Sequence, residues 1–472
     1  MTSPDPGFWS LAQAARAVRD KEISSLELTR AAIARIEAFA PKIDAVAALD
    51  ADGALAQAKA ADAAVARGDA TGTLHGVPLA HKDMYYRAGR ISGCGSKIRA
   101  DFVPDVTSTA LRRLDGAGAL DIARLNMVEF ALGVTGHNEV MPTPKNPWNM
   151  AHITGGSSSG SGAAVAARMV FGAMGSDTGG SIRFPACCNG VVGLKPTWGR
   201  VSRYGAMPLS PSFDTLGPLA RTVEDAALML QAIAGADADD PTASALRVPD
   251  YSAALGTGVK GLKIGVPENY FYDPVADEVA ELVRASLDVL VRAGAELVAV
   301  RVPEIIADTN FLTSMVIATE GAAIHQTWLN ERPGDYGNQT RARMSSGLAT
   351  PATRYLQALR LRRPVLAAFS QAVFDKVDLL HCPVMTTPIP TIAETDLSAN
   401  PGFADLVVGM GHCTRPINFL GLPALTLPCG FTANGLPTAF QLVARPFDET
   451  TMIAAGHAYQ RATDWHEQAP EL

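Results

Sequence analysis

The chain has 472 residues, of which 47% are hydrophobic and 18% charged, and its formal net charge is -7. A charged fraction below the usual value of about 25% is typical of a large globule with little surface for its volume. The charges form no blocks of one sign, which argues against nucleic acid or an anionic membrane as a partner.

The sequence begins without the basic and apolar segments of a secretory signal, and no apolar run reaches the roughly 18 residues that a membrane span requires. The six cysteines have neither the density of a disulfide framework nor the ligand spacing of a metal site. We therefore expect a cytoplasmic protein with reduced thiols, no bound metal and no membrane partner.

The first 70 residues alternate helical patterns with capping signals. The stretch from Ser24 to Glu27 has the pattern of a capping box, and an apolar stripe through Ile33 and Ile36 follows it. We expect a helical lead-in over residues 1–70, and one domain over residues 71–472.

Strand and helix patterns alternate from Val77 onward. The apolar runs VPLAHK, ALDIARL and GVVGLKP stand between helices and Gly-rich turns, as in a buried sheet covered by helices. Residues 236–260 change composition and are expected to cross the protein surface. They lead to a strand-helix-strand unit with its helix over 277–293, which is either a separate lobe or more of the same sheet. A variable, mainly helical region over 306–376 precedes the strands DLLHCPV, ALTLPCGF and AFQLVA, and a last helix begins near Glu449.

Residues 155–162 read GGSSSGSG and lead straight into helix-forming alanines. Glycine amides at a helix start can bind phosphate. A Walker loop, however, has a lysine directly after its last glycine, and here no basic residue follows Gly160 before Arg168. A dinucleotide fingerprint, G-x-G-x-x-G, also fails, because Val165 stands three positions after Gly162 where the last glycine is required. We expect one of the four serines to cap a helix that begins near Ala163, but capping cannot occupy all four.

A second Gly-rich stretch, GSDTGGSIRFP over 175–185, places Ser181 after two glycines in a tight turn. Neighbouring backbone N-H groups in such a turn could converge on one point, which is what a tetrahedral oxyanion requires. The pattern predicts a nucleophilic serine beside an oxyanion hole formed by Thr178, Gly179, Gly180 and Ser181.

A serine hydroxyl needs a base to remove its proton. Lys82 ends an apolar strand within GVPLAHKDM, and a lysine buried in this way can be neutral. We expect desolvation to lower its pKa from about 10.4, because strand alternation points Asp83 away from it. The ordinary alternatives are a surface charge for Lys82 and a core histidine for His81.

GGSSSGSGAAVA, a six-residue gap and AMGSDTGGSIRFPA together are similar to the motif of the amidase signature hydrolases. The resemblance continues through GVPLAHKD, NPW at 146–148, GLKPTWGRVSRYG at 193–205 and GLPALTLPCGF, and so covers nearly the whole chain. It implies an α/β amidase signature fold, with a central mixed, twisted β-sheet covered by helices on both faces.

The resemblance also implies a Ser-Ser-Lys triad. Ser181 is the expected nucleophile, Ser157 the bridging serine after a cis peptide bond, and Lys82 the base. Three further residues are expected to support the site: Ser158, Asp177 and Arg183. The segment EFALGV, 129–134, matches the stretch that borders the acyl pocket in relatives, and its candidate lining residues, which ordinary core packing would explain equally well, are Ala131, Leu132 and Val134.

The activity implied by the resemblance is hydrolysis of a carbonyl C-N bond in a small-molecule amide, aryl amide or carbamate, through an acyl-enzyme and without metal or organic cofactor. We expect a monomer or homodimer. Because EFALGV and the helix through FLTSMVIA offer few charges, we expect an uncharged, partly apolar acyl group.

The alternative function is the glutamine-hydrolysing subunit of a tRNA-dependent amidotransferase, which residues 139–225 resemble well. Residues 343–363 look more like free-standing amidases. A non-catalytic scaffold is disfavoured because all three triad positions are intact.

Overall fold

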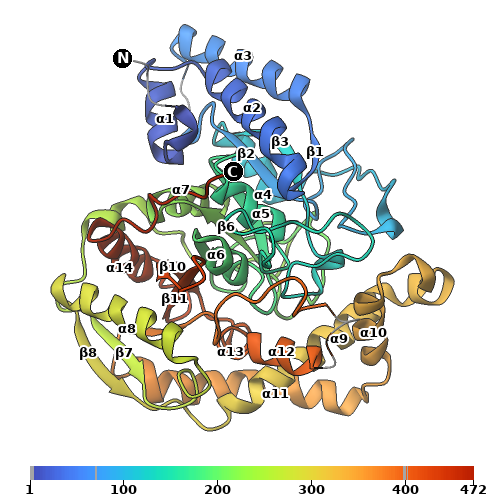
Figure 1. The fold of residues 1–472 in the computed structure, drawn as a ribbon, viewed down its shortest axis with the longest axis vertical. Helices are drawn as coiled ribbons and strands as arrows, with labels where there is room; N and C mark the ends of the chain where they lie inside the picture. Colours follow the sequence, from blue (N-terminus) through green and yellow to red (C-terminus); the bar gives the residue numbers. More distant parts are fainter. Residues whose placement is uncertain (1–4, 70–71, 397–399, 401) are drawn as a thin grey trace.

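The structure, a computed structural model, describes residues 5–69, 72–396, 400 and 402–472. One mixed sheet runs through the molecule, and helices flank it (Figure 1). This arrangement confirms the predicted fold class. The strands of the sheet are β1 (Val46–Leu49), β2 (Pro78–Lys82), β3 (Leu120–Leu125), β4 (Gly172–Asp177), β5 (Val192–Lys195), β6 (Thr215–Ala220), β7 (Lys263–Pro267), β8 (Glu296–Val300), β9 (Leu379–Pro383), β10 (Ala424–Phe431) and β11 (Pro437–Ala444).

The α-helices that the described residues form are long enough for about two to seven turns, and none of them has the length and apolarity to cross a bilayer. They are α1 (Leu11–Arg19), α2 (Ser25–Ile43), α3 (Ala51–Arg67), α4 (Thr109–Gly116), α5 (Ser159–Ala166), α6 (Arg183–Asn189), α7 (Val223–Ile233), α8 (Asp277–Arg292), α9 (Ile306–Glu331), α10 (Asn338–Leu348), α11 (Ala352–Phe369), α12 (Phe403–Met410), α13 (Arg415–Leu420) and α14 (Glu449–Arg461).

The strands follow the order β1-β3-β2-β4-β6-β5-β10-β11-β9-β7-β8 across the sheet. β2 runs parallel to β3 and β4, whereas β10 and β11 form an antiparallel pair that lies between β5 and β9. β7 pairs with β9 as well as with β8, so the strand-helix-strand unit extends the same sheet. The strands nearest the chain's end therefore join the two halves of the sheet.

The N-terminal segment is tied to the sheet. Ser24 and Glu27 form the predicted capping box at the start of α2, with the Glu27 N-H donating to Ser24 Oγ at 3.1 Å and the Ser24 N-H donating to Glu27 Oε2 at 2.9 Å. β1 interrupts the helices and pairs with β3. Residues 70 and 71, where the predicted lead-in ends, lie outside the described residues.

The region over 306–376 is mainly helical, as predicted, and comprises α9, α10, α11 and a π-helical turn at Ser370–Phe374. The last helix begins at Glu449, also as predicted. Every residue of β2 and β4 is buried, because these strands lie in the interior of the sheet with helices packed against them. Their parallel carboxyl ends open on one edge, and this edge carries the site described next.

Candidate active site

Three polar side chains meet where β2 and β4 end. Lys82 is fully buried, and its Nζ lies 2.7 Å from Ser157 Oγ and 2.8 Å from Ser176 Oγ. Ala80 and Ala173 are register partners in the parallel pair, so the following Lys82 and Ser176 leave the sheet at the same edge. The amine is thus held between a loop hydroxyl and a strand hydroxyl.

Burial lowers the pKa of Lys82 to about 7, while the negative charges of Asp214 and Asp177 oppose the shift. The carboxylate of Asp83, the residue after Lys82, accepts a hydrogen bond from the N-H of Gly93 at 3.0 Å and none from the Lys82 amine. The prediction that desolvation dominates at Lys82 is therefore confirmed. Near neutral pH a large share of this amine is uncharged and can accept a proton.

The loop that carries Ser157 is bonded to β4. The peptide between Gly156 and Ser157 is cis, as the resemblance implied. α5 begins at Ser159, not near Ala163, and no side chain caps it. The expectation of a capping serine is wrong: the hydroxyls of Ser157, Ser158 and Ser161 bind elsewhere, and that of Ser159 is buried without a hydrogen-bond partner in the described part of the chain. Ser158 Oγ donates to the carbonyl of Ser176 at 3.3 Å and accepts from its N-H at 3.2 Å.

Gly160 shows why the loop needs glycine. A Cβ at this position would lie 2.4 Å from the carbonyl oxygen of Ala45 and 2.5 Å from that of Asn126. Any side chain would push the start of α5 away from the backbone that precedes β1 and follows β3. The close approach fixes the loop, and with it Ser157, against the sheet.

The turn after β4 carries the predicted nucleophile and oxyanion hole. Gly180 has a φ of 127°, and a Cβ there would lie 2.4 Å from the Phe184 ring, so only glycine fits. Its N-H donates to Asp177 Oδ1 at 2.8 Å and is engaged. Among the described residues, none accepts a hydrogen bond from the N-H of Gly179 or Ser181. The N-H of Thr178 likewise has no acceptor there, so these three amides are left open for an oxyanion.

Ser181 is 4% exposed, and the N-H of Ser158 donates to its carbonyl at 3.3 Å, which holds the two loops together. Its hydroxyl makes no hydrogen bond with Ser157 or any other group in the described part of the chain. Hydrogen bonds of a catalytic relay often tighten only when substrate is bound. The structure thus brings Ser181 close to Ser157 and Lys82, but no hydrogen bond links the hydroxyl of Ser181 to that of Ser157.

Asp177 and Arg183 support this turn. Both are fully buried and paired at 3.0 Å. Burial alone would raise the pKa of Asp177, but the charge and hydrogen bonds of Arg183 outweigh it and hold the pKa well below its usual range. Arg183 also donates to the carbonyl of Thr414 and to Gln441 Oε1, each at 3.0 Å. The pair therefore ties the turn to α13 and β11.

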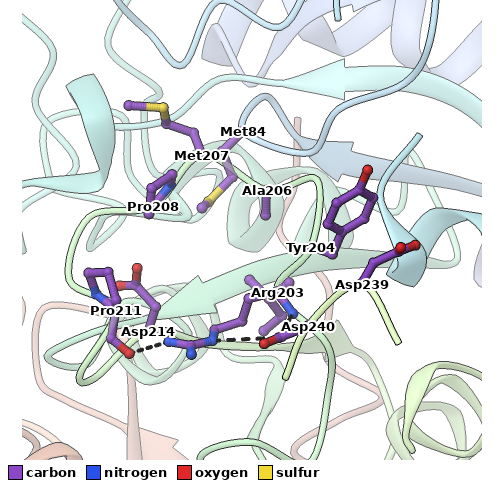
Figure 2. Close-up of a pocket in the computed structure, with 11 residues that line it drawn as sticks. Met84, Arg203, Tyr204, Ala206, Met207, Pro208, Pro211, Asp214, Asp239 and Asp240 are labelled. Carbon is purple, nitrogen blue, oxygen red and sulfur yellow. Dashed lines mark hydrogen bonds and ion pairs between the residues drawn. The ribbon is translucent and has the colours of Figure 1, made fainter. Parts of the chain in front are cut away.

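Thr178 is held from the opposite side. Its hydroxyl donates to Asp214 Oδ1 at 2.6 Å, and burial raises the pKa of Asp214 to about 6. Asp214 lines a cavity of about 230 Å³, which Figure 2 shows together with Arg203 and Met207. Of the described residues around this cavity, none belongs to the expected triad. The cavity therefore adjoins the site through Asp214, and Ser181 is not among its lining residues.

The segment EFALGV adjoins Ser157 on both sides. The N-H of Val128, just before the segment, donates to the carbonyl of Ser157 at 3.1 Å, and the N-H of Gly156 donates to that of Val134 at 2.6 Å. Phe130 packs edge-on against His325 of α9, with ring centroids 4.2 Å apart. The segment thus borders the site, while the role of its lining candidates stays a prediction. All three are buried: Ala131 and Leu132 in the main core, Val134 in a smaller cluster.

Two residues of the site escaped the sequence reasoning: Ser176 and Asp214. Only Ser176 left a usable signal, because it lies inside the GSDTGGSIRFP stretch that was recognised as part of the site. Asp214 lies 36 residues beyond Thr178 in the sequence, and only the folded chain brings the two together.

Known proteins resemble this chain along nearly its whole length. The family model for amidases matches residues 27–453. This protein belongs to the amidase signature family. Among its relatives, a glutamyl-tRNA(Gln) amidotransferase subunit of Roseiflexus sp. (strain RS-1) is 40% identical over 485 residues, covering 98% of each chain.

Two solved structures extend the comparison of this amidase signature enzyme. A crystal structure of an amidase is 32% identical with a TM-score of 0.85, covering 96% of this chain and 99% of the other. An inhibitor-bound structure, described as a vestigial protein complex that reveals the origins of an s-triazine catabolic enzyme, is 33% identical with a TM-score of 0.89, covering 96% and 98%. Family and fold together support amide hydrolysis as the class of reaction.

Proposed function

We propose that the protein hydrolyses the carbonyl C-N bond of a small-molecule amide, aryl amide or carbamate through an acyl-enzyme on Ser181. The observation that carries this proposal is the buried contact of 2.7 Å between Lys82 Nζ and Ser157 Oγ, placed beside Ser181. A lysine with a pKa near 7 can accept a proton at physiological pH, whereas a solvated lysine cannot.

In the first half of the reaction, Ser181 Oγ attacks the carbonyl carbon and passes its proton to Ser157, whose own proton moves to Lys82 Nζ. The amides of Thr178, Gly179 and Ser181 stabilise the oxyanion of the tetrahedral intermediate. The proton then returns through Ser157 to the leaving nitrogen, and the C-N bond breaks.

In the second half, a water molecule takes the place of the leaving amine. It loses a proton through Ser157 to Lys82 and attacks the acyl carbon. The bond between that carbon and Ser181 Oγ then breaks, the proton returns through Ser157 to Ser181 Oγ, and the acid is released. Each step uses only side chains and amides of this chain, so the proposal requires no metal or organic cofactor.

Covalent labelling tests the nucleophile. A fluorophosphonate is expected to modify Ser181 alone, and Ser181→Ala should abolish both labelling and turnover while the protein stays folded. Cys187→Ser, which alters a buried thiol on α6, is the control and should label normally. An adduct that a peptide map places on Ser158 or Cys187 would contradict the assignment.

The second candidate is the glutamine-hydrolysing subunit of a glutamyl-tRNA(Gln) amidotransferase, favoured by the 40% identity with the Roseiflexus protein along the full length of both chains. In that role the enzyme would release ammonia from glutamine within a multi-subunit assembly, and tRNA would be a partner of the assembly. Co-expression with the other amidotransferase subunits of the same organism tests it. Copurification together with glutaminase activity that depends on those subunits would favour this candidate over a free-standing amidase.

A further inference from the structure

Asp214 stands across the sheet from the oxyanion turn. Thr215, the first residue of β6, is the register partner of Asp177, the last residue of β4, in an antiparallel pair. The residue before Thr215 and the residue after Asp177 therefore leave the sheet at the same edge. These two residues are Asp214 and Thr178, and the Thr178 hydroxyl donates to Asp214 Oδ1 at 2.6 Å.

The carboxylate of Asp214 is buried, and neutral donors hold it. The side chain is 4% exposed, and its second oxygen accepts hydrogen bonds from the N-H groups of Leu209 and Ser210, each at 2.9 Å. Burial raises the pKa of Asp214 to about 6, while these donors and the Thr178 hydroxyl oppose the rise. The group is therefore mostly a carboxylate at neutral pH, and it is fixed in position.

No basic side chain pairs with Asp214 in the part of the chain that the structure describes. Arg203 lines the same cavity, but its contacts in Figure 2 are to the carbonyl of Pro211 and to the carboxylate of Asp240, which lies 3.9 Å from its Nε. Arg203 acts on Asp214 only through space. Asp214 is thus a buried negative charge without an ion pair.

Lys82 is the buried amine on the other side of β4. Three groups from the surrounding elements act on its charge: Asp214 before β6, Asp177 at the end of β4 and Cys94 in the loop after β2. Burial raises the pKa of the Cys94 thiol to about 12, so this group stays neutral. Asp177 is balanced by its ion pair with Arg183 at 3.0 Å. Asp214 is the one of the three whose charge is left to act on Lys82.

The reaction creates a positive charge at this place. When Ser181 attacks, Lys82 changes from a neutral amine to an ammonium, which burial disfavours. A fixed carboxylate nearby stabilises this ammonium, as an aspartate stabilises the imidazolium of a Ser-His-Asp triad. Because Asp214 is already held by its donors, the stabilisation needs no rearrangement during the reaction.

We propose that Asp214 is the counter-ion of the Lys82 ammonium that forms during the reaction, and that Thr178 holds its carboxylate in place. The proposal rests on the proposed function and specifies how the base of that reaction is tuned. Asp214 makes no hydrogen bond with Ser157 or Lys82, so it is a positioning residue and not a member of the relay. Its loss should weaken the base without removing it.

Asp214→Asn tests the counter-ion, because asparagine keeps the size of the side chain and removes its charge. The loss of a negative charge lowers the pKa of Lys82 further, so the rise of kcat/KM with pH for a neutral amide should move to lower pH by about one unit or more. On the plateau, kcat should fall by about 10-fold to 10²-fold with little change in KM. A wild-type profile in this variant would overturn the proposal.

Asp225→Asn is the matched control. Asp225 is also fully buried with a raised pKa and accepts a hydrogen bond from a backbone N-H, that of Ala12 at 2.9 Å, but its charge acts on Arg221 and not on Lys82. This variant should leave the pH profile unchanged. A shift that Asp225→Asn shares with Asp214→Asn would show that any lost buried carboxylate moves the profile, and would overturn the assignment.

Thr178→Val and Thr178→Ser test the link to the oxyanion turn. Valine removes the hydroxyl that most strongly lowers the pKa of Asp214, so the carboxylate should form, and the full rate should be reached, only at higher pH. This shift is opposite in direction to that of Asp214→Asn, and it remains informative if Asp214→Asn fails to fold. Serine keeps the donor and should leave the rise at its wild-type pH. A rise that stays in place in Thr178→Val would overturn the role of Thr178.

A direct titration of Lys82 separates this proposal from the proposed function. In Ser181→Ala protein that carries lysine labelled with carbon-13 at Cε, the NMR signal that Lys82→Met removes reports the protonation of this amine without turnover. Asp214→Asn should lower the pKa of Lys82, and Asp225→Asn should not. If Ser181 labels and amides are hydrolysed but this pKa does not fall in Asp214→Asn, the counter-ion fails and the amidase function stands. If the pKa falls but the wild type neither labels at Ser181 nor hydrolyses any amide, the function fails and the pairing of Lys82 with Asp214 stands.

Discussion

Two lysines of this protein share almost every property except the chemistry of their neighbours. Lys82 ends β2 and Lys195 ends β5, both are fully buried, and burial lowers the pKa of each to about 7. Lys82 contacts the hydroxyls of Ser157 and Ser176. Lys195 donates to the carbonyls of Pro196 and Leu422 at 3.0 and 2.6 Å.

A hydroxyl both donates and accepts, whereas a carbonyl only accepts. Neutral Lys82 can therefore receive a proton from Ser157, but Lys195 must always donate to satisfy its partners. A lowered lysine pKa alone does not mark a base. The neighbouring groups decide whether the shift serves proton transfer or accompanies a structural tie between β5 and the segment before β10.

The largest expected effect is on turnover. Lys82→Met should reduce kcat/KM by about 10²-fold to 10⁴-fold, as for the loss of a general base, whereas Lys195→Met should keep kcat/KM within a few-fold of the wild type. Both are measured with one neutral amide on protein shown to be folded by circular dichroism. Equal losses in the two variants would remove the distinction between the lysines.

The pH profile of kcat/KM shows which of the two lysines must lose its proton for catalysis. Below pH 7 Lys82 is protonated and cannot act as a base, and above it the neutral amine dominates, because its folded pKa is lowered to about 7. The wild-type kcat/KM for an uncharged substrate should rise through that value and then level off. Lys195→Met should retain this rising limb. Lys82→Met should lack it, and a limb that persists there would identify another base.

Ser176→Ala sharpens the role of the hydroxyl neighbours. Ser176 Oγ accepts a hydrogen bond that favours the charged form of Lys82, so its removal should lower the pKa of Lys82 further. We expect the rising limb to move to lower pH and kcat/KM on the plateau to fall by about tenfold, with Ser176→Thr restoring both. A purely structural role would reduce the rate without moving the limb.

The smallest expected effect is on stability. Lys195→Met should leave two buried carbonyls without a donor and lower the free energy of unfolding by about 1–3 kcal/mol. The shift of the urea midpoint, compared with that of Lys82→Met, measures it. If Lys195→Met is as stable as the wild type, the carbonyl contacts are not a structural tie.

The sequence was a good guide where local chemistry decides the structure. The capping box at Ser24 forms as predicted because it needs only four consecutive residues. The burial of Lys82 followed from the apolar strand that it ends. Capping by the GGSSSGSG serines was wrongly predicted because propensity ignored a competing partner, the backbone of Ser176 on β4.

Contacts between distant segments escaped prediction for the same reason. The carboxylate of Asp177 accepts a hydrogen bond from the side chain of Asn418 at 2.8 Å, and no motif indicates this contact. Arg183 reaches the carbonyl of Thr414 across more than 200 residues of chain, and nothing local distinguishes it from a surface arginine. The question whether the unit around α8 is a lobe or part of the sheet was likewise decided only by the pairing of β7 with β9.

The place of β10 and β11 in the middle of the sheet has a consequence for synthesis of the protein on the ribosome. Until these strands emerge, β5 and β9 are unpaired edges of two separate half-sheets, and such edges invite association with other chains. Two hydrogen-bond acceptors of Arg183, the carbonyl of Thr414 just before α13 and the side chain of Gln441 on β11, are likewise synthesised only near the end of the chain. The nascent chain therefore carries every residue of the GGSSSGSG and GSDTGGS motifs long before it can hold them in their final arrangement.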